Sequence, residues 1–518
     1  MTITTAKRSL GRLPRLAPLA AALMVALPAQ AQWKVTPTLS LTETYTDNVL
    51  LQSDANKRSE WVTQAIPGIA VRGQNSRVQL NASASAAFYK YSDGRPPGTR
   101  SNNTQYDADG RVKVIDELLY VDARAHRDSR AVSAFGIRDD GGNRFSNENT
   151  TDLTTWSISP YLTQRFGNLA VATLRYTRDN TDADATQFGS SSADSIMFDL
   201  ASGRAWRDLG WTMRYARQDL HTDQFGDTAS KNTLLGLNYA LSRTLKLTAT
   251  GGYDSYDYAA LGGRTAGRSW SLGFDWKPSA RTAVEMSAGR HFFGTTGALQ
   301  VSHRSRHSVL KMSYSDEVTN TRAQFTLPQA LDTASLLDSL FAASVPDPVA
   351  RQRAIEAYLL ATGLPPFLAE DVNYLTNRYF RQKLAQVSFA FSKRAHGLVL
   401  SAYANERVAL SSGEADSNLL GSQLFALNDS VRQLGASAAH SYRIDARTSA
   451  TATLLATRNR SLTTNIESDQ QNLRLALTRR FSRKLSGSVE LRHTRGERGQ
   501  FGADYKENAI SATLSAQL

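Results

Sequence analysis

The chain has few histidines and no cysteine, and the spacing of the histidines fits no metal motif. It contains eight His and no Cys. His291, His303 and His307 form the only histidine cluster, and we expect them to flank one external loop. Zinc sites need close ligand geometry, usually with Cys or a nearby carboxylate, so no metal is predicted there. The stretch from Asp139 to Asn143 lacks the alternate-position spacing and the terminal Glu of a calcium loop, so a polar loop is predicted.

Serine is abundant, but no arrangement for nucleophilic catalysis is visible. The chain has no Gly-x-Ser-x-Gly nucleophile elbow. Gly251-Gly252 and Gly262-Gly263 resemble no phosphate-binding loop, because a glycine in a strand more often marks a bend or close packing. No cofactor is predicted, and we expect the protein not to be an enzyme. An enzyme acting on lipid or glycan at the rim of a β-barrel stays open as an alternative.

Charged residues that lie opposite apolar residues in alternating stretches are the remaining candidates for function. In a closed barrel these residues would line the lumen while the apolar ones face lipid. They could form a mixed-charge lining whose opposite charges pair with one another and which holds water. They could instead form a net-basic lining that favours anionic solutes or an acidic polysaccharide. The predicted lumen-facing residues are Arg175, Asp199, Arg214, Glu285, Arg474, Glu490 and Arg492.

Strands of alternating polarity must position these residues. From Arg77 to Tyr91, apolar residues occupy every second position, with Gln, Asn and Ser between them. Successive side chains of a strand point to opposite faces, so this stretch predicts a strand with one apolar face. The same pattern recurs from Trp33–Tyr45 to Ala509–Leu518. It predicts an all-β fold, a transmembrane antiparallel β-barrel of about 20–22 strands, with 22 favoured because closed bacterial barrels have even numbers. Pairing of the last strand with the first would remove both sheet edges.

The connections between the predicted strands alternate between short turns and long polar loops. Transmembrane barrels have short periplasmic turns and longer extracellular loops. Long loops are expected at Asp182–Ala193, Thr222–Ser230 and Gly294–Arg304, among others. Arg306–Leu327 is ambiguous. It could be one long strand, or two strands with a turn at Val318-Thr319-Asn320, and only the second keeps the short turns on one side.

The first 31 residues read as a secretory signal peptide. Lys7, Arg8, Arg12 and Arg15 precede the apolar run Leu16–Leu27, and Ala29-Gln30-Ala31 is an Ala-x-Ala cleavage site. The barrel is then expected over residues 32–518. The formal charge is +13, and removing those four basic residues would leave +9. A basic exported protein meets lipid headgroups or acidic polymers rather than nucleic acid.

Residues 328–376 interrupt the strand pattern with a short helical insertion. Leu331–Ala342 has apolar residues on one side, and Pro348–Thr362 begins after a capping Asp347 and ends at Gly363. The insertion could be a folded loop resting on the rim. It could equally be a plug in the lumen, since barrels of about 22 strands commonly carry one.

Several segments of the chain resemble one known family. Thr36–Leu51, Gln64–Ile69, Ser159–Leu162, Leu337–Phe341 and Gly363–Pro366 are similar to segments of the outer-membrane proteins associated with the PEP-CTERM/exosortase system. The resemblance implies an outer-membrane barrel in a Gram-negative bacterium, encoded with exopolysaccharide and protein-sorting machinery. It implies no catalytic residues.

These observations lead to an expected function and two alternatives. We expect an outer-membrane β-barrel associated with an exopolysaccharide or envelope protein-sorting system, as a conduit or assembly partner. A general diffusion porin is the first alternative, and the rim-located enzyme is the second. The expected partners are outer-membrane lipid, the barrel-insertion machinery, and exopolysaccharide export components or an acidic polysaccharide.

Overall fold

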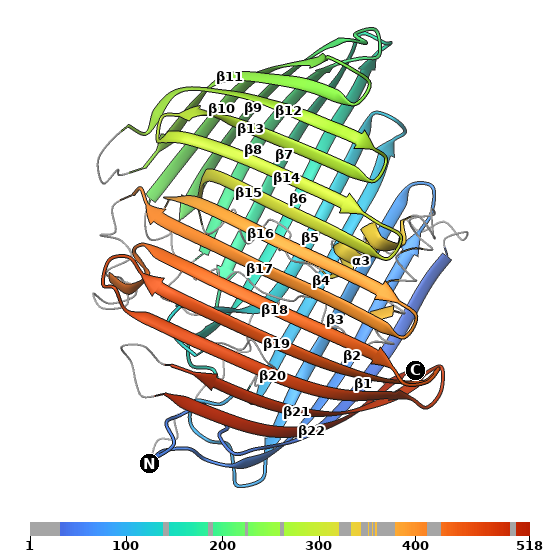
Figure 1. Ribbon diagram of the computed structural model, residues 1–518, viewed down its shortest axis with the longest axis vertical. Helices are drawn as coiled ribbons and strands as arrows, with labels where there is room; N and C mark the ends of the chain where they lie inside the picture. The colour runs from blue at the N-terminus through green and yellow to red at the C-terminus, as the bar shows by residue number, and fades with distance from the viewer. Residues whose placement is uncertain are drawn as a thin grey trace, which may run out of the picture.

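A computed structural model shows a closed, antiparallel barrel of 22 strands. It describes residues 32–137, 145–184, 190–222, 226–258, 264–320, 333–342, 351, 355, 358–359, 379–411, 426–497 and 504–518. Each strand pairs with its neighbours in the chain, so the strands follow one another around the wall (Figure 1). No described helix has the length and apolar character needed to cross a membrane.

The strands are long enough to cross a bilayer and extend beyond it. They have 10 to 17 residues, whereas a tilted spanning strand needs about 9–11. The first eleven are β1 Gln32–Thr46, β2 Glu60–Gln74, β3 Val78–Tyr91, β4 Asn102–Ile115, β5 Leu119–Ala131, β6 Thr150–Phe166, β7 Ala170–Ala183, β8 Ser190–Ser202, β9 Leu209–Thr222, β10 Gly226–Ala240 and β11 Leu245–Asp257. The others are β12 Ala266–Ser279, β13 Thr282–His291, β14 Gly294–Arg304, β15 Ser308–Asn320, β16 Tyr379–Lys393, β17 His396–Ala409, β18 Val431–Arg443, β19 Thr448–Ser461, β20 Glu467–Arg480, β21 Leu485–Gly496 and β22 Tyr505–Gln517.

The barrel closes where β1 pairs with β22. The ladder runs from Thr38 opposite Gln517 to Thr46 opposite Ala509. On the inner face, hydroxyl groups meet across this seam, with oxygen–oxygen distances of 2.8 Å for Ser40 and Ser515 and 3.0 Å for Thr42 and Thr513. The predicted pairing of the first and last strands is therefore confirmed, and both sheet edges are removed.

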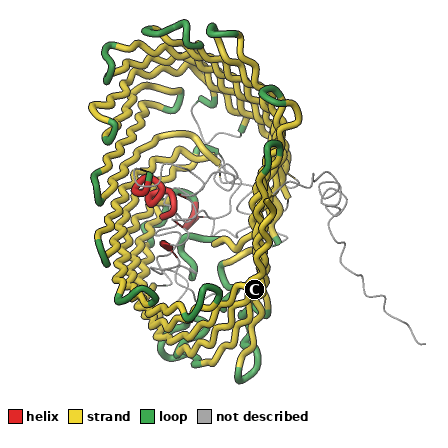
Figure 2. Tube along the Cα trace, turned by 90° about the vertical axis from the view of Figure 1, so that its right-hand side faces the viewer, coloured by secondary structure: helices red, strands yellow, loops and turns green. Residues whose placement is uncertain are grey.

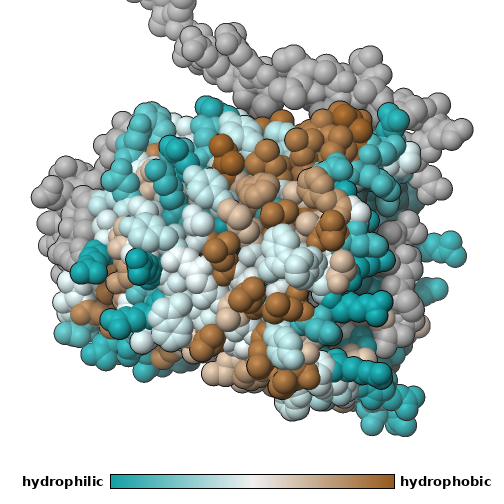
Figure 3. Space-filling model, turned by 90° about the horizontal axis from the view of Figure 1, so that it is seen from above, coloured by the Kyte–Doolittle hydropathy of each residue, from teal (hydrophilic) through white to brown (hydrophobic). Residues whose placement is uncertain are grey.

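Alternation along each strand separates a lipid-facing surface from the lumen. On β12 the exposed outward residues are Trp270, Leu272 and Trp276, which is the apolar face of a membrane barrel. Figure 3 shows such brown apolar side chains as a band, with hydrophilic side chains along both margins. Trp206 and Phe88, which lie near the ends of strands, are also exposed, whereas Tyr89, Tyr91, Tyr379 and Phe380 are buried.

One region of the wall differs from the sequence-based expectation. Gly294–Arg304, predicted as a long loop, forms strand β14. Its Gly and Thr residues hide the alternation, but Leu299 lies opposite the outward Met286. Gly294 has a φ of 128°, a conformation that glycine adopts readily, and β13 turns into β14 within two residues there. Within Arg306–Leu327, β15 runs unbroken to Asn320, which excludes the alternative with a turn at Val318-Thr319-Asn320.

Two other predicted loops are shorter than expected. β7 continues to Ala183 and β8 begins at Ser190, and β10 begins at Gly226. The Asp, Thr and Ser residues at these ends extend the strands beyond the apolar band, because ladder hydrogen bonds satisfy the backbone of polar and apolar residues equally well.

Candidate functional site: the barrel lumen

One side of the lumen is lined by paired charges on β4 to β9. Asp122 of β5 lies at the centre of one group. The Arg111 Nε lies 2.7 Å from one of its carboxylate oxygens, and the Arg175 Nη1 lies 3.1 Å from the other. The Arg175 guanidinium also lies 4.0 Å from the centre of the Tyr161 ring, a favourable cation–π distance. The predicted residue Arg175 is thus held by a partner from a strand two places away.

The next predicted pair on this wall consists of Asp199 of β8 and Arg214 of β9. They occupy opposite positions in the ladder, and the Arg214 Nε donates to the Asp199 carboxylate at 2.6 Å. Farther along, the Glu285 carboxylate lies 3.7 Å from the Lys277 Nζ, which donates to Asp275 at 2.8 Å. All three acidic groups therefore have a cation within reach. This wall presents ion pairs rather than free charges of one sign.

Near the closure seam, Arg492 of β21 forms an ion pair that is more buried than the others in the part of the lumen that the structure describes. Its Nη2 lies 3.0 Å from a carboxylate oxygen of Glu507, whose side chain is fully buried. The Thr46 hydroxyl donates to the same carboxylate at 2.7 Å. Glu490 lies 3.9 Å from the Arg492 Nη1, and Arg474 donates to the Asn472 side chain at 3.2 Å.

The structure thus places the seven predicted residues on strand faces opposite the exposed apolar residues, but in separate groups. Sequence reasoning missed the partners Asp122, Lys277 and Glu507. Asp122 lies between Val121 and Ala123, so the alternation could have identified it. The choice of partner could not be predicted, because it depends on the register between neighbouring strands.

The opposite side of the lumen, on β16 to β19, is lined mainly by amides and hydroxyls, with Arg407 of β17 buried among them. The Gln382 amide donates to Asn405 at 2.8 Å, and the Asn405 amide donates to Gln433 at 3.0 Å. The hydroxyls of Ser401 and Ser437 lie 2.5 Å apart. Each of these residues is buried. The lumen therefore has one wall of ion pairs and one wall of mainly uncharged, hydrogen-bonded groups, which we call the neutral wall.

Helix α3, Thr333–Phe341, packs against the neutral wall inside the barrel (Figure 2). Its apolar residues Leu336, Leu337 and Leu340 are buried. They belong to clusters that include Val309 of β15, Ala390 of β16, Val399 of β17 and Ala439 of β18. The small Ala side chains leave room for the helix, so the sequence of these strands fits a docked helix at this place.

Residues of the second predicted helix pack beside α3. Ile355 is buried, and Tyr358 and Leu359 pack against the same clusters. The Arg351 Nε donates to the Asp338 carboxylate of α3 at 2.6 Å, and the rings of Tyr358 and Phe341 lie 5.4 Å apart in an edge arrangement. We call α3 together with these four residues the helical hairpin.

The helical hairpin lies far from the end of the barrel where its segment leaves the wall. The segment starts after Asn320, at the loop end of β15, and returns at Tyr379. Val309, which packs against α3, lies eleven residues before Asn320 at the short-turn end. At a rise of about 3.3 Å per residue, the contact with Val309 therefore lies roughly 35 Å along the strand from the point where the segment leaves the wall.

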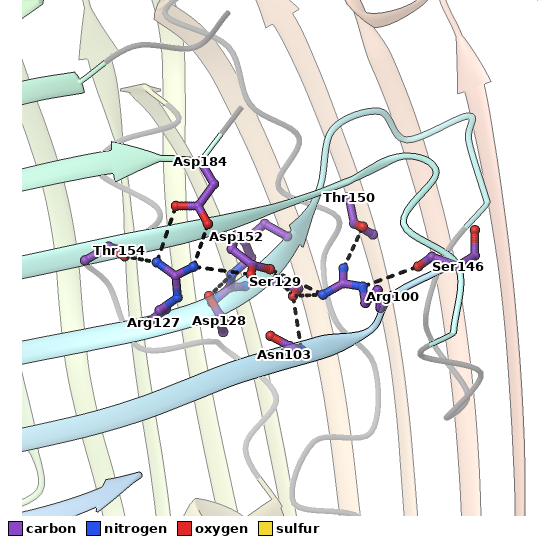
Figure 4. Close-up of polar contacts among 11 residues, drawn as sticks. Arg100, Asn103, Arg127, Asp128, Ser129, Ser146, Thr150, Asp152, Thr154 and Asp184 are labelled. Atoms are coloured by element: carbon purple, nitrogen blue, oxygen red, sulfur yellow. Dashed lines mark hydrogen bonds and ion pairs between the residues drawn. The ribbon is translucent and has the colours of Figure 1, made fainter. Parts of the chain in front are cut away.

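At the loop end, an ionic cluster on the outer face ties two loops to the wall (Figure 4). Arg100, from the loop between β3 and β4, is buried and donates to Ser129 at 2.7 Å and to Thr150 at 2.6 Å. The Arg127 Nη2 lies 2.5 Å from Asp184 and 3.4 Å from Asp152. The cluster braces the rim without facing the lumen.

The histidine cluster predicted from the sequence does not exist as a group. His291 lies at the loop end of β13, 2.6 Å from an Asp254 carboxylate oxygen. His303 lies near the short-turn end of β14, 2.9 Å from the Thr282 hydroxyl, and His307 lies in the turn after it. The prediction that they flank one external loop was wrong, because Gly294–Arg304 is a strand that separates them by the thickness of the membrane.

The described residues contain no group of three or more His, Asp or Glu that could hold a metal ion. Within the same residues, His rings contact Asp, Asn, Thr or another His, and none of them contacts a serine hydroxyl. The stretch Asp139 to Asn143 lies outside the described residues.

The closed sheet, its apolar outer band and its polar lumen define the class of the protein. It is an outer-membrane β-barrel, and it resides in the outer membrane of a Gram-negative bacterium.

Comparisons with known proteins add no family. No protein-family model and no curated protein sequence matches the chain. Similar solved structures include the FrpB iron transporter from Neisseria meningitidis, with 9% identity, a TM-score of 0.48, and coverage of 93% of this chain and 81% of that one. A mutant of the ferric enterobactin receptor PfeA from Pseudomonas aeruginosa has 11% identity, a TM-score of 0.46 and coverage of 94% and 80%. The siderophore receptor PirA from Pseudomonas aeruginosa has 9% identity, a TM-score of 0.40 and the same coverage.

Proposed function

We propose that the barrel is a conduit across the outer membrane in which the helical hairpin acts as a plug. The observation that carries the proposal is the docking of α3 on the lumen wall near the short-turn end. A loop that only covered the rim would not bury Leu336, Leu337 and Leu340 against the lumen wall so far from its attachment points. A segment docked inside the pore narrows it, and its release widens it.

The lumen chemistry and the sequence resemblance favour the secretion of a polysaccharide as the task of this conduit. Paired charges on one wall and amides on the other offer hydrogen bonds to a hydrated polymer without a strong fixed charge that would trap it. The resemblance to the PEP-CTERM/exosortase-associated barrels supports a role beside exopolysaccharide or protein-sorting components. The proposed cargo is an acidic polysaccharide, and the proposed partners are the export components that deliver it to the periplasmic mouth.

Planar-bilayer recordings test the conduit directly. We expect the intact protein to conduct little, and a variant lacking Pro328–Thr376 to form a stable open pore. A variant with a shortened loop at Thr463–Asn465, which lies at the rim between β19 and β20, is the matched control and should conduct like the intact protein. Soluble oligouronates should block the open pore from the short-turn side.

Two results would contradict the proposal. A large, weakly selective conductance in the intact protein would favour a general diffusion porin instead. A barrel that stays closed after the deletion would indicate a scaffold rather than a conduit. In the host bacterium, loss of the gene should reduce the surface polysaccharide and leave it in the periplasm, and unchanged surface polysaccharide would exclude this cargo.

A further inference from the structure

The short-turn end of the barrel carries many exposed cations and few acids. The acidic residues in the ten short turns are Asp116, Glu117, Asp208 and Asp445. The exposed basic residues in these turns are Arg77, Arg204, Arg207, Arg243, Arg281, Arg306, Arg394, Arg447, Arg483 and Lys484. We call these ten residues the basic collar. The loop end differs, because its cations are interspersed with acids, as in the pairs of Arg458 with Asp469 and Arg432 with Glu406.

The same turns also expose large apolar side chains next to the cations. Trp206 stands between Arg204 and Arg207 and is 45% exposed. Phe481 precedes Arg483 and Lys484 and is 51% exposed. In other turns Leu241 and Ile444 are exposed in the same way beside basic residues. Apolar side chains at this level belong in the interface between water and lipid, where aromatic residues anchor membrane proteins.

Four residues of the collar, Arg394, Arg447, Arg483 and Lys484, lie on three neighbouring turns, those that join β16 to β17, β18 to β19 and β20 to β21. The turns lie side by side because β17 pairs with β18 and β19 pairs with β20. Adjacent turns are then roughly 10 Å apart, twice the spacing of neighbouring strands. The acid among them, Asp445, accepts the backbone N–H of Arg447 at 2.6 Å and of Thr448 at 2.8 Å. Its carboxylate is therefore engaged by its own turn.

We propose that the basic collar binds anionic phospholipids of the leaflet that faces the periplasm. The exposed apolar residue of a turn enters the acyl boundary, and this fixes the neighbouring cations at the level of the headgroup phosphates. Guanidinium groups bind phosphate with two parallel hydrogen bonds. An acidic polysaccharide would also meet the cations, but it offers nothing to the apolar side chains beside them. The chemistry of the turns therefore favours lipid.

Native mass spectrometry of the intact, detergent-folded barrel tests this inference. The probes are phosphatidylglycerol and phosphatidylcholine with the same acyl chains, added together. The collar variant combines Arg447→Gln, Arg483→Gln, Lys484→Gln and Arg243→Gln, which change exposed side chains in turns. The matched control combines Lys231→Gln, Arg268→Gln, Arg290→Gln and Lys506→Gln, which remove four exposed cations at the loop end. Heat-modifiable gel migration verifies that each variant is folded.

We expect the wild type to retain phosphatidylglycerol in preference to phosphatidylcholine. Each cation near an anionic lipid surface adds to the binding free energy, so the collar variant should lose this preference by about tenfold or more. The control variant should keep it. If the glutamine variant fails to fold, the substitutions Arg447→Lys and Arg483→Lys serve instead, and they should keep the preference because they keep the charge. Equal retention of both lipids by the wild type, or equal losses in the collar variant and the control, would overturn the proposal. Binding of a soluble polyuronate that depends on the collar, with no lipid preference, would assign the surface to the polymer.

Discussion

The substitution Leu337→Ala should release the helical hairpin from the lumen wall. Leu337 is 1% exposed and packs with Val309 of β15, Leu340 and Ile355. Truncating a buried Leu to Ala costs about 2–5 kcal/mol at well-packed sites. Every 1.4 kcal/mol is about tenfold in an equilibrium constant. The ratio of docked to undocked hairpin should therefore fall by about 30-fold or more.

Two measurements read out this release. In planar bilayers, the Leu337→Ala protein should open more often and for longer than the wild type. Labelling gives an independent measure, because the chain has no Cys and a single Ala390→Cys reports on the wall beneath the helix. Ala390 is fully buried in the cluster that holds Leu336. A water-soluble maleimide should label this Cys slowly in the wild-type background and much faster in combination with Leu337→Ala.

The control for this experiment is Leu475→Ala on β20. Leu475 is 47% exposed and faces lipid, so its truncation leaves the lumen unchanged. Both its conductance and the labelling of Ala390→Cys should match the wild type. The reasoning fails if Leu337→Ala changes neither readout. The hairpin would then be held by contacts other than this apolar docking.

Three further predictions concern the wall and the turns. Deleting Ala509–Leu518 should abolish membrane assembly, because it removes most of the strand that pairs with β1. The measurement is the loss of heat-modifiable gel migration, and a normally assembled barrel would contradict the closure argument. Glu507→Gln should destabilise the barrel by about 3–5 kcal/mol, because it removes the buried countercharge of Arg492. The control Asp469→Asn, which breaks an exposed pair with Arg458, should cost less than about 1 kcal/mol. Urea unfolding in lipid vesicles compares the two variants. The backbone N–H of Arg447 and the side chain of Thr448 hold the pKa of the Asp445 carboxyl below its usual value of 3.8. The ionised carboxylate therefore stabilises its turn above that pH and loses this effect as the pH falls through the lowered pKa. The difference in stability between wild type and Asp445→Ala, measured by unfolding at a series of pH values, should be constant near neutrality and shrink below about pH 4. A difference that persists at low pH would refute this sign.

Alternation along the strands predicted much of the barrel, because one face of every strand must meet lipid. This alternation is plain at β12, where Trp270, Leu272, Phe274 and Trp276 occupy every second position. It is weak at β14, where Gly294 and Gly297 carry no side chain to reveal a face. The three-residue turn Ser305–His307 and the connection at Phe292–Phe293 were therefore misplaced. The error carried over to the histidines, since the assumed loop was the only reason to group them.

The residues of the lumen were predictable one by one but not as pairs. Arg175 and Asp122 both lie between residues of the outward face, yet nothing local indicates that they meet. Their contact depends on how β5, β6 and β7 are staggered, and register is set by the whole apolar pattern and the turns together. The position of α3 was beyond sequence reasoning for a related reason. The Ala residues that make room for it, Ala390 and Ala439, lie on two separate strands.

The two ends of the barrel require different chemistry, and the distribution of charge reflects this. At the loop end, Arg127 lies between Asp152 and Asp184, and Arg458 pairs with Asp469. These cations are neutralised within the protein and stabilise its rim. At the short-turn end, Arg483 and Lys484 have no acid in their own turn, and these exposed cations are open to countercharges from outside the chain. In our proposal those countercharges are lipid phosphates at the periplasmic face. Turns bound to these lipids would hold the mouth of the barrel at a fixed height relative to the membrane surface. The helical hairpin docks near the same end, so lipid anchoring of the barrel and gating of the pore by the hairpin would act at one end of the molecule.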